Sequence, residues 1–149
     1  MTHPFQTLVL TGAAGKVITV TGARCSAVST AAATATLNAV KRSTANSSGT
    51  SAAMTAVPMD SADATAAATA LSYTANPTTG TLVGNVGSTH ISSVTAASTA
   101  VPVMPAGFTW PYPTGPRLRA ATDVFALNGN GASFTSGFAA NCTLTWVEE

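Results

Sequence analysis

The sequence predicts an all-β protein, an antiparallel β-sandwich of about eight strands with the topology of a jelly roll. Three observations lead to this prediction. Short segments rich in Val, Thr, Ile and aromatic residues alternate apolar and polar positions. Connections rich in Asn, Gly and Pro separate these segments, and none has the apolar stripe of a long helix. No internal repeat of fixed period is visible, which argues against a solenoid or a propeller.

Alternation assigns the strands and the faces that they bury. In the last predicted strand, Cys142, Leu144 and Trp146 share one face, which we expect to point into the core. By the same spacing Leu37 shares a face with Ala39 and Ala35, and a third segment places Leu71 beside Tyr73. The segments predicted as strands are 5–11, 16–21, 34–41, 69–73, 81–86, 90–94, 123–127 and 141–147.

Turn residues set the boundaries between these strands. The segments 46–49, 76–80 and 128–131 combine Asn, Pro and Gly where a fixed or positive φ is needed. Asn128-Gly129 is the strongest hairpin signal, with a longer loop as the alternative because of Gly131. Five prolines in 101–116 predict an extended stretch at a sheet edge or in a crossover. The Ala-rich segment 61–71 is predicted as a loop that runs into a strand, with a short helix as the alternative.

Composition predicts one neutral domain over 1–149 and excludes several classes of protein. Ala, Thr and Ser number 30, 26 and 14, and charged residues make up only 7% of the chain. A net charge of +1 gives little attraction to nucleic acid, and no apolar run is long enough to span a bilayer. The first residues lack the pattern of a signal peptide. Because two cysteines without a secretion signal are more often reduced, Cys25 and Cys142 are predicted to be buried thiols rather than a disulfide.

No motif carries a convincing chemistry, so the sequence predicts neither an enzyme nor a cofactor. Gly12 to Val17 fails the spacing of a phosphate loop and is interpreted as a turn. The sequence has no Gly-x-Ser-x-Gly nucleophile elbow with which His90 could form a catalytic triad, so His90 is interpreted as a strand residue. Asp60 and Asp63 supply only two carboxylates, which are too few ligands for a calcium-binding loop. The two sites that match the glycosylation pattern are expected by chance in a chain so rich in Ser and Thr.

Two groups of residues are candidates for contact with a partner. The basic residues either are solvated charges or pair with an acidic surface. The aromatic residues of 108–112 either form a lid on the core or anchor an interface. An arm at 1–6 could lie on a neighbour, unless its aromatic residue begins the first strand. The candidate contact residues are Phe5, Lys41, Arg42, Trp110, Tyr112, Arg117 and Arg119.

Several segments together resemble the small virion structural proteins of tailed bacteriophages. They are 41–50, Val57-Pro-Met-Asp60, 73–84, Leu127-Asn128 and the closing 144–149, and the similarity extends from about Val17 to the C-terminus. The proline-rich stretch 101–116 departs from the family pattern.

Among such proteins the nearest known architecture is the jelly-roll capsid cement, or decoration, protein. The resemblance implies a protein made in the bacterial cytoplasm that decorates the outside of the virion head. It would bind major capsid protein subunits and itself, as a homodimer or homotrimer, without nucleic acid or membrane partners. The alternatives are a tail or head–tail accessory protein and a carbohydrate-binding jelly roll.

Overall fold

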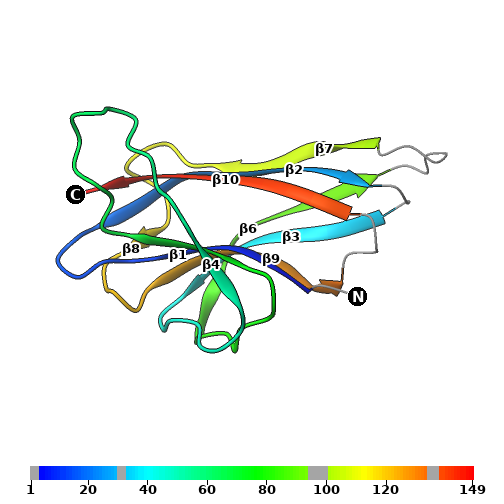
Figure 1. Cartoon of the computed structure of the whole chain (residues 1–149), viewed down its shortest axis with the longest axis horizontal. Coiled ribbons are helices and arrows are strands. Elements are labelled where there is room, and N and C mark those ends of the chain that lie inside the picture. The colour runs from blue at the N-terminus through cyan, green and yellow to red at the C-terminus, as the bar shows by residue number, and fades with distance from the viewer. Residues whose placement is uncertain (1–3, 30–32, 94–100, 134–137) are drawn as a thin grey trace.

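The computed structural model describes residues 4–29, 33–93, 101–133 and 138–149, and these form an antiparallel β-sandwich (Figure 1). The all-β prediction is therefore confirmed. The strands of the described residues are β1 (Pro4–Thr11), β2 (Ile18–Ser29), β3 (Ala33–Arg42), β4 (Ser51–Met54), β5 (Thr69–Tyr73), β6 (Leu82–Ser93), β7 (Val101–Thr109), β8 (Arg117–Leu118), β9 (Val124–Ser133) and β10 (Phe138–Glu148).

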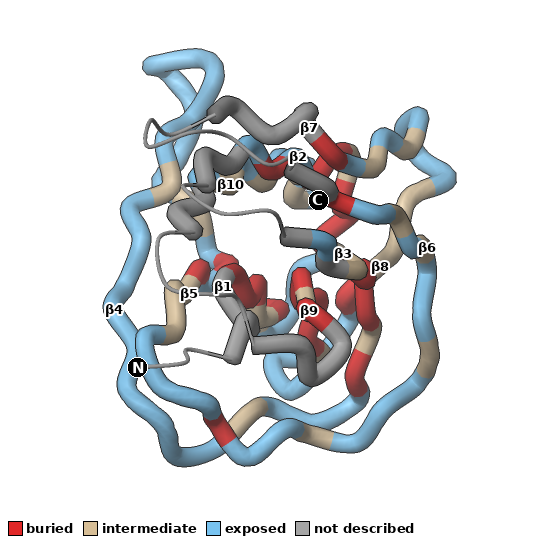
Figure 2. The backbone as a smooth tube through the Cα atoms, turned by 90° about the vertical axis from the view of Figure 1, so that its right-hand side faces the viewer, coloured by how far each residue is buried: buried red, intermediate tan, exposed pale blue. Residues whose placement is uncertain are grey.

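The strands divide into sheets of six and four. The larger sheet has the order β4-β5-β1-β9-β3-β6, and the smaller one places β2 between β10 and β7, with β8 paired to the start of β2. A jelly roll has eight strands in two Greek keys, so this division does not confirm jelly-roll topology. The edges of the larger sheet, β4 and β6, lie on opposite sides of the molecule and are largely exposed (Figure 2).

The core lies between the two sheets. Its largest fully buried side chains include Phe125, Leu10 and Leu37, and Cys142, Leu144 and Trp146 pack against it as predicted. The centre of the six-stranded sheet is also buried on its other face. There Val9, Val124 and Ala126 form a second cluster, and Tyr73 packs against it. Adjacent strand residues point to opposite faces, which explains why Val9 and Leu10 belong to different clusters.

Several strands run further than local sequence predicts. β2 continues through Gly22, where a Cβ would lie 2.7 Å from Oγ1 of Thr145, so this glycine marks a close approach and not a turn. The segments predicted at 81–86 and 90–94 fall in one strand, β6, which covers Leu82–Ser93; residue 94 lies outside the described residues. Asn128-Gly129 lies inside β9, so the predicted hairpin turn there is wrong.

Other expectations agree with the structure. Residues 61–68 form a loop that runs into β5, and the proline-rich β7 lies at a sheet edge. β1 begins at Pro4, which pairs with Ser133, and Gln6 pairs with Asn128. Residues 4–6 therefore belong to the sheet and not to a separate arm, which fits the alternative in which Phe5 lies in the first strand. Residues 1–3 lie outside the described residues.

Cys25 and Cys142 form a disulfide, so the prediction of two free thiols is wrong. The two residues are direct partners in the pairing of β2 with β10, and their Cα atoms lie 4.1 Å apart. Facing residues of an antiparallel pair approach this closely when no ladder hydrogen bond joins them. The disulfide thus ties the last strand to the middle of its own sheet.

Candidate contact surface

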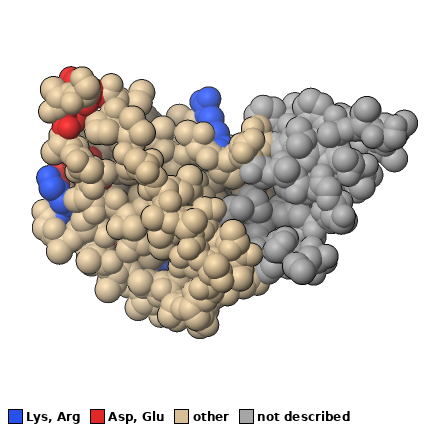
Figure 3. Space-filling model, in the orientation of Figure 1, with Lys and Arg blue, Asp and Glu red and all other residues tan. Residues whose placement is uncertain are grey.

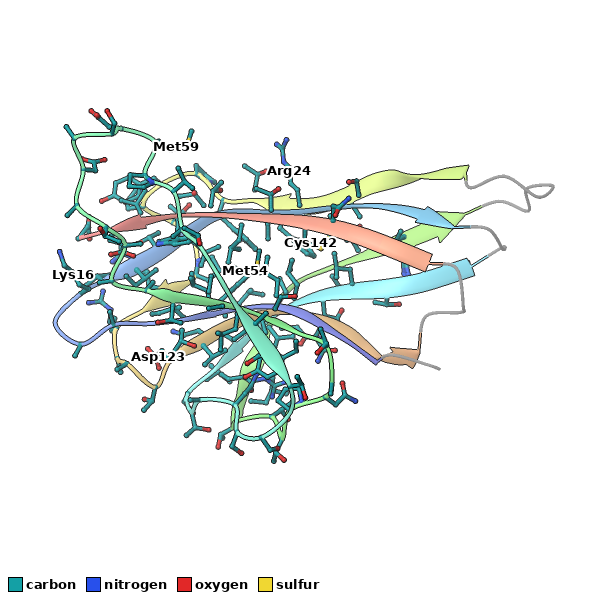
Figure 4. The ribbon with its side chains drawn as sticks, in the orientation of Figure 1. Lys16, Arg24, Met54, Met59, Asp123 and Cys142 are labelled. Carbon is teal, nitrogen blue, oxygen red and sulfur yellow. A yellow bond between two sulfur atoms is a disulfide. The ribbon has the colours of Figure 1, made fainter. Side chains whose placement is uncertain are left out.

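Charged side chains gather toward one end of the long axis of the molecule. Lys16 and Asp123 lie at the end that also carries the C-terminus, whereas Arg24 projects from the middle of the sandwich (Figure 4). The face seen in Figure 3 is otherwise almost free of charge over its described part. One reason is that the sequence contains no Asp, Glu, Lys or Arg between residues 64 and 116.

At the charged end, the chain leaves the small sheet after Trp110 and returns to it at Pro116. The backbone N–H of Trp110 donates to the Thr21 carbonyl (2.9 Å), and Val20 N–H donates to the Pro116 carbonyl (2.9 Å). The Trp110 ring stacks on Phe108 and meets the edge of Phe125 in the facing sheet. Trp110 is thus a lid on the core, one of the two alternatives that the sequence left open.

Tyr112 lies in the excursion between these two hydrogen bonds and reaches the C-terminus. Its hydroxyl donates to Oε1 of Glu149, at the end of β10. The hydrogen bond to Glu149, burial and the charge of Glu149 raise the pKa of Tyr112, while Arg117 opposes the shift. Tyr112 is half-exposed and already held by this contact.

Glu148 connects the small sheet to the loop that precedes β5. Its carboxylate accepts the backbone N–H groups of Ala67 (2.8 Å) and Ala68 (3.0 Å) and the indole N–H of Trp146 (2.9 Å). Burial raises the pKa of Glu148, but these three hydrogen bonds and the charge of Lys16 outweigh it, so the net shift is downward. Glu148 therefore fixes the end of the 55–68 loop against β10.

The basic candidates are in different environments. Arg42 is only 6% exposed, and its guanidinium donates to the Gly80 carbonyl (2.9 Å), so it holds the 74–81 loop within the chain. Burial lowers the pKa of Arg42. Lys41 is half-buried in the same strand. Arg117 donates to the Pro113 carbonyl (3.1 Å), and Arg119 is exposed.

The most exposed apolar side chains lie in two places that the sequence did not indicate as contacts, the 55–68 loop and the β6 edge; Met54 of β4 and Val147 of β10 are also exposed. Met59 is 100% exposed and Val57 79% exposed in the 55–68 loop. The turn beneath them is ordered, because Oδ1 of Asp60 accepts the N–H of Ala62 (2.9 Å) and the Asp60 carbonyl accepts that of Asp63 (3.1 Å). The second place is the β6 edge, where Leu82, Val83 and Val86 are exposed.

Sequence could find these residues only in part. Val57-Pro-Met-Asp60 combines two residues that favour turns with two apolar residues, which is a weak signal for an exposed apolar loop. The exposure of Val83 and Val86 depends on how β6 pairs with β3, because both residues lie at shifts in that register, and alternation alone cannot show this.

The residue types that could hold a metal stay apart in the described part of the chain. No cluster of three or more His, Cys, Asp or Glu able to hold a metal occurs among the described residues. His90 lies on β6 with Nδ1 3.3 Å from Oγ1 of Thr36, and residues 12–17 form a turn, both as predicted. Within the described part of the chain, no helix has the length and the apolar composition that crossing a membrane requires.

Comparisons with known proteins complete this description. Protein-family models, curated proteins and solved structures were each compared with the chain, and none matches it. The surface features above therefore carry the functional argument, beside the resemblance described from the sequence.

Proposed function

We propose that this chain is a structural protein of a bacteriophage virion, a cement protein that decorates the head and clamps neighbouring major capsid protein subunits. It acts by binding and carries out no reaction. The observation that carries the proposal is the pair of exposed apolar side chains on an ordered loop, Met59, which is fully exposed, and Val57, which is 79% exposed. Apolar groups presented in this way are typical of a contact with another protein.

The geometry of the 55–68 loop supports a binding role. Glu148 fixes its end to β10, and Asp60 orders the turn near its tip. Binding then costs little additional ordering of the loop, which leaves more of the contact energy for affinity. A repeating shell would also multiply a modest contact through avidity.

The carbohydrate-binding alternative receives less support. Stacking on a sugar would need an exposed aromatic face, and Trp110 instead packs between Phe108 and Phe125. Tyr112 remains partly exposed but is bonded to Glu149.

The proposal is tested on virions with and without this protein. A ligand that binds only the assembled shell stabilises it, so we expect heads that lack the protein to release DNA at a lower temperature than complete heads. Copies in numbers comparable to the major capsid subunits support a place on the head. A few copies per particle, or an unchanged release temperature, would overturn the cement proposal.

The contact itself is tested with Met59→Asp, because this side chain makes no buried contact in the chain. We expect binding to stripped heads to weaken at least about tenfold. Thr55→Asp is the matched control, since Thr55 is exposed in the same loop but is not apolar. Equal binding of the Met59 and Thr55 variants would exclude this loop as the contact.

A further inference from the structure

The two sulfur atoms of the disulfide lie in different surroundings. Cys25 belongs to β2, the middle strand of the small sheet, and is only 1% exposed. Cys142 belongs to β10, an edge strand of that sheet, and is half-buried. It lies near the middle of the long axis, away from the charged end (Figure 4). Of the two cysteines, Cys142 is therefore the one at the border of the sandwich.

Strand neighbours enclose Cys25 on both sides. It pairs with Cys142 of β10 and, on the opposite side, with Ala106 of β7. Cys25 and Ala106 are both buried in the main core. Cys142, by contrast, has β2 on one side, and no strand of the described residues follows it in the sheet on the other. The line from the sulfur of Cys25 to that of Cys142 thus leads from an enclosed strand to a sheet edge.

The contact of the 55–68 loop with β10 lies elsewhere on the strand. The loop reaches β10 at Glu148, through the backbone N–H groups of Ala67 and Ala68. At the rise of a β-strand, Glu148 lies about 20 Å from Cys142 along β10. The two residues that flank Cys142 in the strand, Asn141 and Thr143, are exposed. A small molecule can therefore approach this stretch of β10 while the loop stays in place.

This difference in access decides how the disulfide can exchange. A thiolate attacks one sulfur of a disulfide and displaces the other, and the rate depends on which sulfur can be reached. Displacement at sulfur requires the incoming atom to approach in line with the bond that breaks. Attack on Cys25 would therefore come from the side of β7, where Ala106 is packed. Attack on Cys142 comes from beyond the edge strand.

We propose that Cys142 is a modification site, the sulfur at which a small thiol such as glutathione enters the disulfide. The thiolate forms a bond to Sγ of Cys142 while the bond to Sγ of Cys25 breaks, and the electron pair leaves with Cys25. The Cys25 thiolate then takes a proton from water. Cys25 is reduced and the incoming thiol is oxidised, so the exchange needs no other oxidant or reductant. The product carries a mixed disulfide on β10 and a thiol on β2.

The fold can accommodate this product. The backbone pairing of β10 with β2 continues well beyond the disulfide, as far as Glu148 with Ile18. The new thiol of Cys25 suits the core, because a protonated cysteine behaves as a small apolar side chain. The added group lies at the edge strand, outside the sheet. Exchange at Cys142 is therefore a local event that does not require unfolding, and it is independent of the proposed function.

The site of entry is tested on the folded wild type. The oxidised chain is incubated with reduced glutathione at about pH 8, where part of the thiol is ionised, then quenched with acid and digested for mass spectrometry. We expect the glutathione adduct on Cys142 to exceed that on Cys25 at least about tenfold. The same reaction in concentrated urea is the control. Unfolding removes the difference in access, so the two adducts should then form in comparable amounts.

Two single-cysteine variants provide a second measurement. Cys25→Ser leaves only the thiol of Cys142, and Cys142→Ser leaves only that of Cys25, with both folds checked by circular dichroism. The chromogenic disulfide dithiobis(nitrobenzoate) should react with the Cys142 thiol at least about tenfold faster than with the Cys25 thiol. If a variant fails to fold, the ratio of adducts in the wild type decides.

Three results would overturn the inference: an adduct mainly on Cys25, exchange that takes place only in urea, or equal thiol rates in the two folded variants. None of them bears on the head binding of the Met59 variant. Failure here is therefore distinct from failure of the proposed function.

Discussion

Glu148 joins the two sheets on the side of the sandwich opposite to the contact of β6 with β7. Its carboxylate accepts three N–H groups, two of them from the backbone of the facing loop. A charged acceptor suits this position, because hydrogen bonds to an ionised group are stronger than those between neutral groups. The same bonds hold the pKa of Glu148 below its ordinary value of 4.5, even though burial acts in the opposite direction.

Glu148→Gln should therefore destabilise the fold and reduce its dependence on pH. The amide keeps the shape but turns an NH₂ group toward backbone donors, for an expected loss of about 1–2 kcal/mol in the free energy of unfolding. Because the folded pKa is lowered, the contribution of Glu148 is complete above its unfolded pKa and is lost as pH falls through the folded value. Urea unfolding at neutral pH and at about pH 3 measures both effects.

Asp63→Asn provides the control for this measurement, since Asp63 is an exposed carboxylate of the same loop. The wild type and the Asp63 variant should lose more stability between the two pH values than the Glu148 variant does. Parallel losses in all three proteins would show that Glu148 does not bear this part of the pH dependence.

At the scale of the strands, local pattern predicts what a strand buries but not where it ends or what lies beside it. The alternation of Cys142, Leu144 and Trp146 correctly predicts which side chains pack against the core. Asn128-Gly129 has the composition of a hairpin turn, yet pairing with β1 and β3 on either side keeps it within β9. Tertiary pairing outweighs turn propensity at this position.

In the candidate contact surface, too, the sequence identifies suitable side chains but not their surroundings in the fold. Sequence identifies Arg42 and Trp110 as chemically suited to a contact, but only the fold shows that both are used inside the chain. The exposure of Val83 and Val86 and the disulfide both depend on register between distant strands. Register is a property of two segments together, so a single segment cannot predict it.

The disulfide between β2 and β10 should be a major source of stability. Cys25 and Cys142 are 117 residues apart in the sequence, so the cross-link restricts a very long loop of the unfolded chain. The chain-entropy model gives about 4–5 kcal/mol for a loop of this size. A reducing agent should accordingly lower the thermal midpoint of the wild type by many degrees. If the protein is made in a reducing cytoplasm, this part of its stability would be gained only after release.

The variant Cys25→Ala/Cys142→Ala separates the cross-link from other effects of the reductant. It should melt close to the reduced wild type, and reductant should leave its midpoint unchanged. A wild-type midpoint that does not respond to reductant, with complete reduction verified by thiol titration, would contradict the assigned role.

For the molecule as a whole, the scarcity of charge determines how it responds to salt. Only 11 residues are charged, and none lies between 64 and 116, so burial of apolar groups and backbone pairing bear most of the stability. Salt screens the interactions between exposed charges and so weakens them. Salts that are excluded from the protein surface strengthen the burial of apolar groups instead. We expect the thermal midpoint at neutral pH to change by less than about 3 °C between low salt and about 1 M NaCl, since few charge interactions are available to be screened. Calorimetry at the two salt concentrations measures this change. A midpoint that falls steeply with salt would assign the stability to ion pairs.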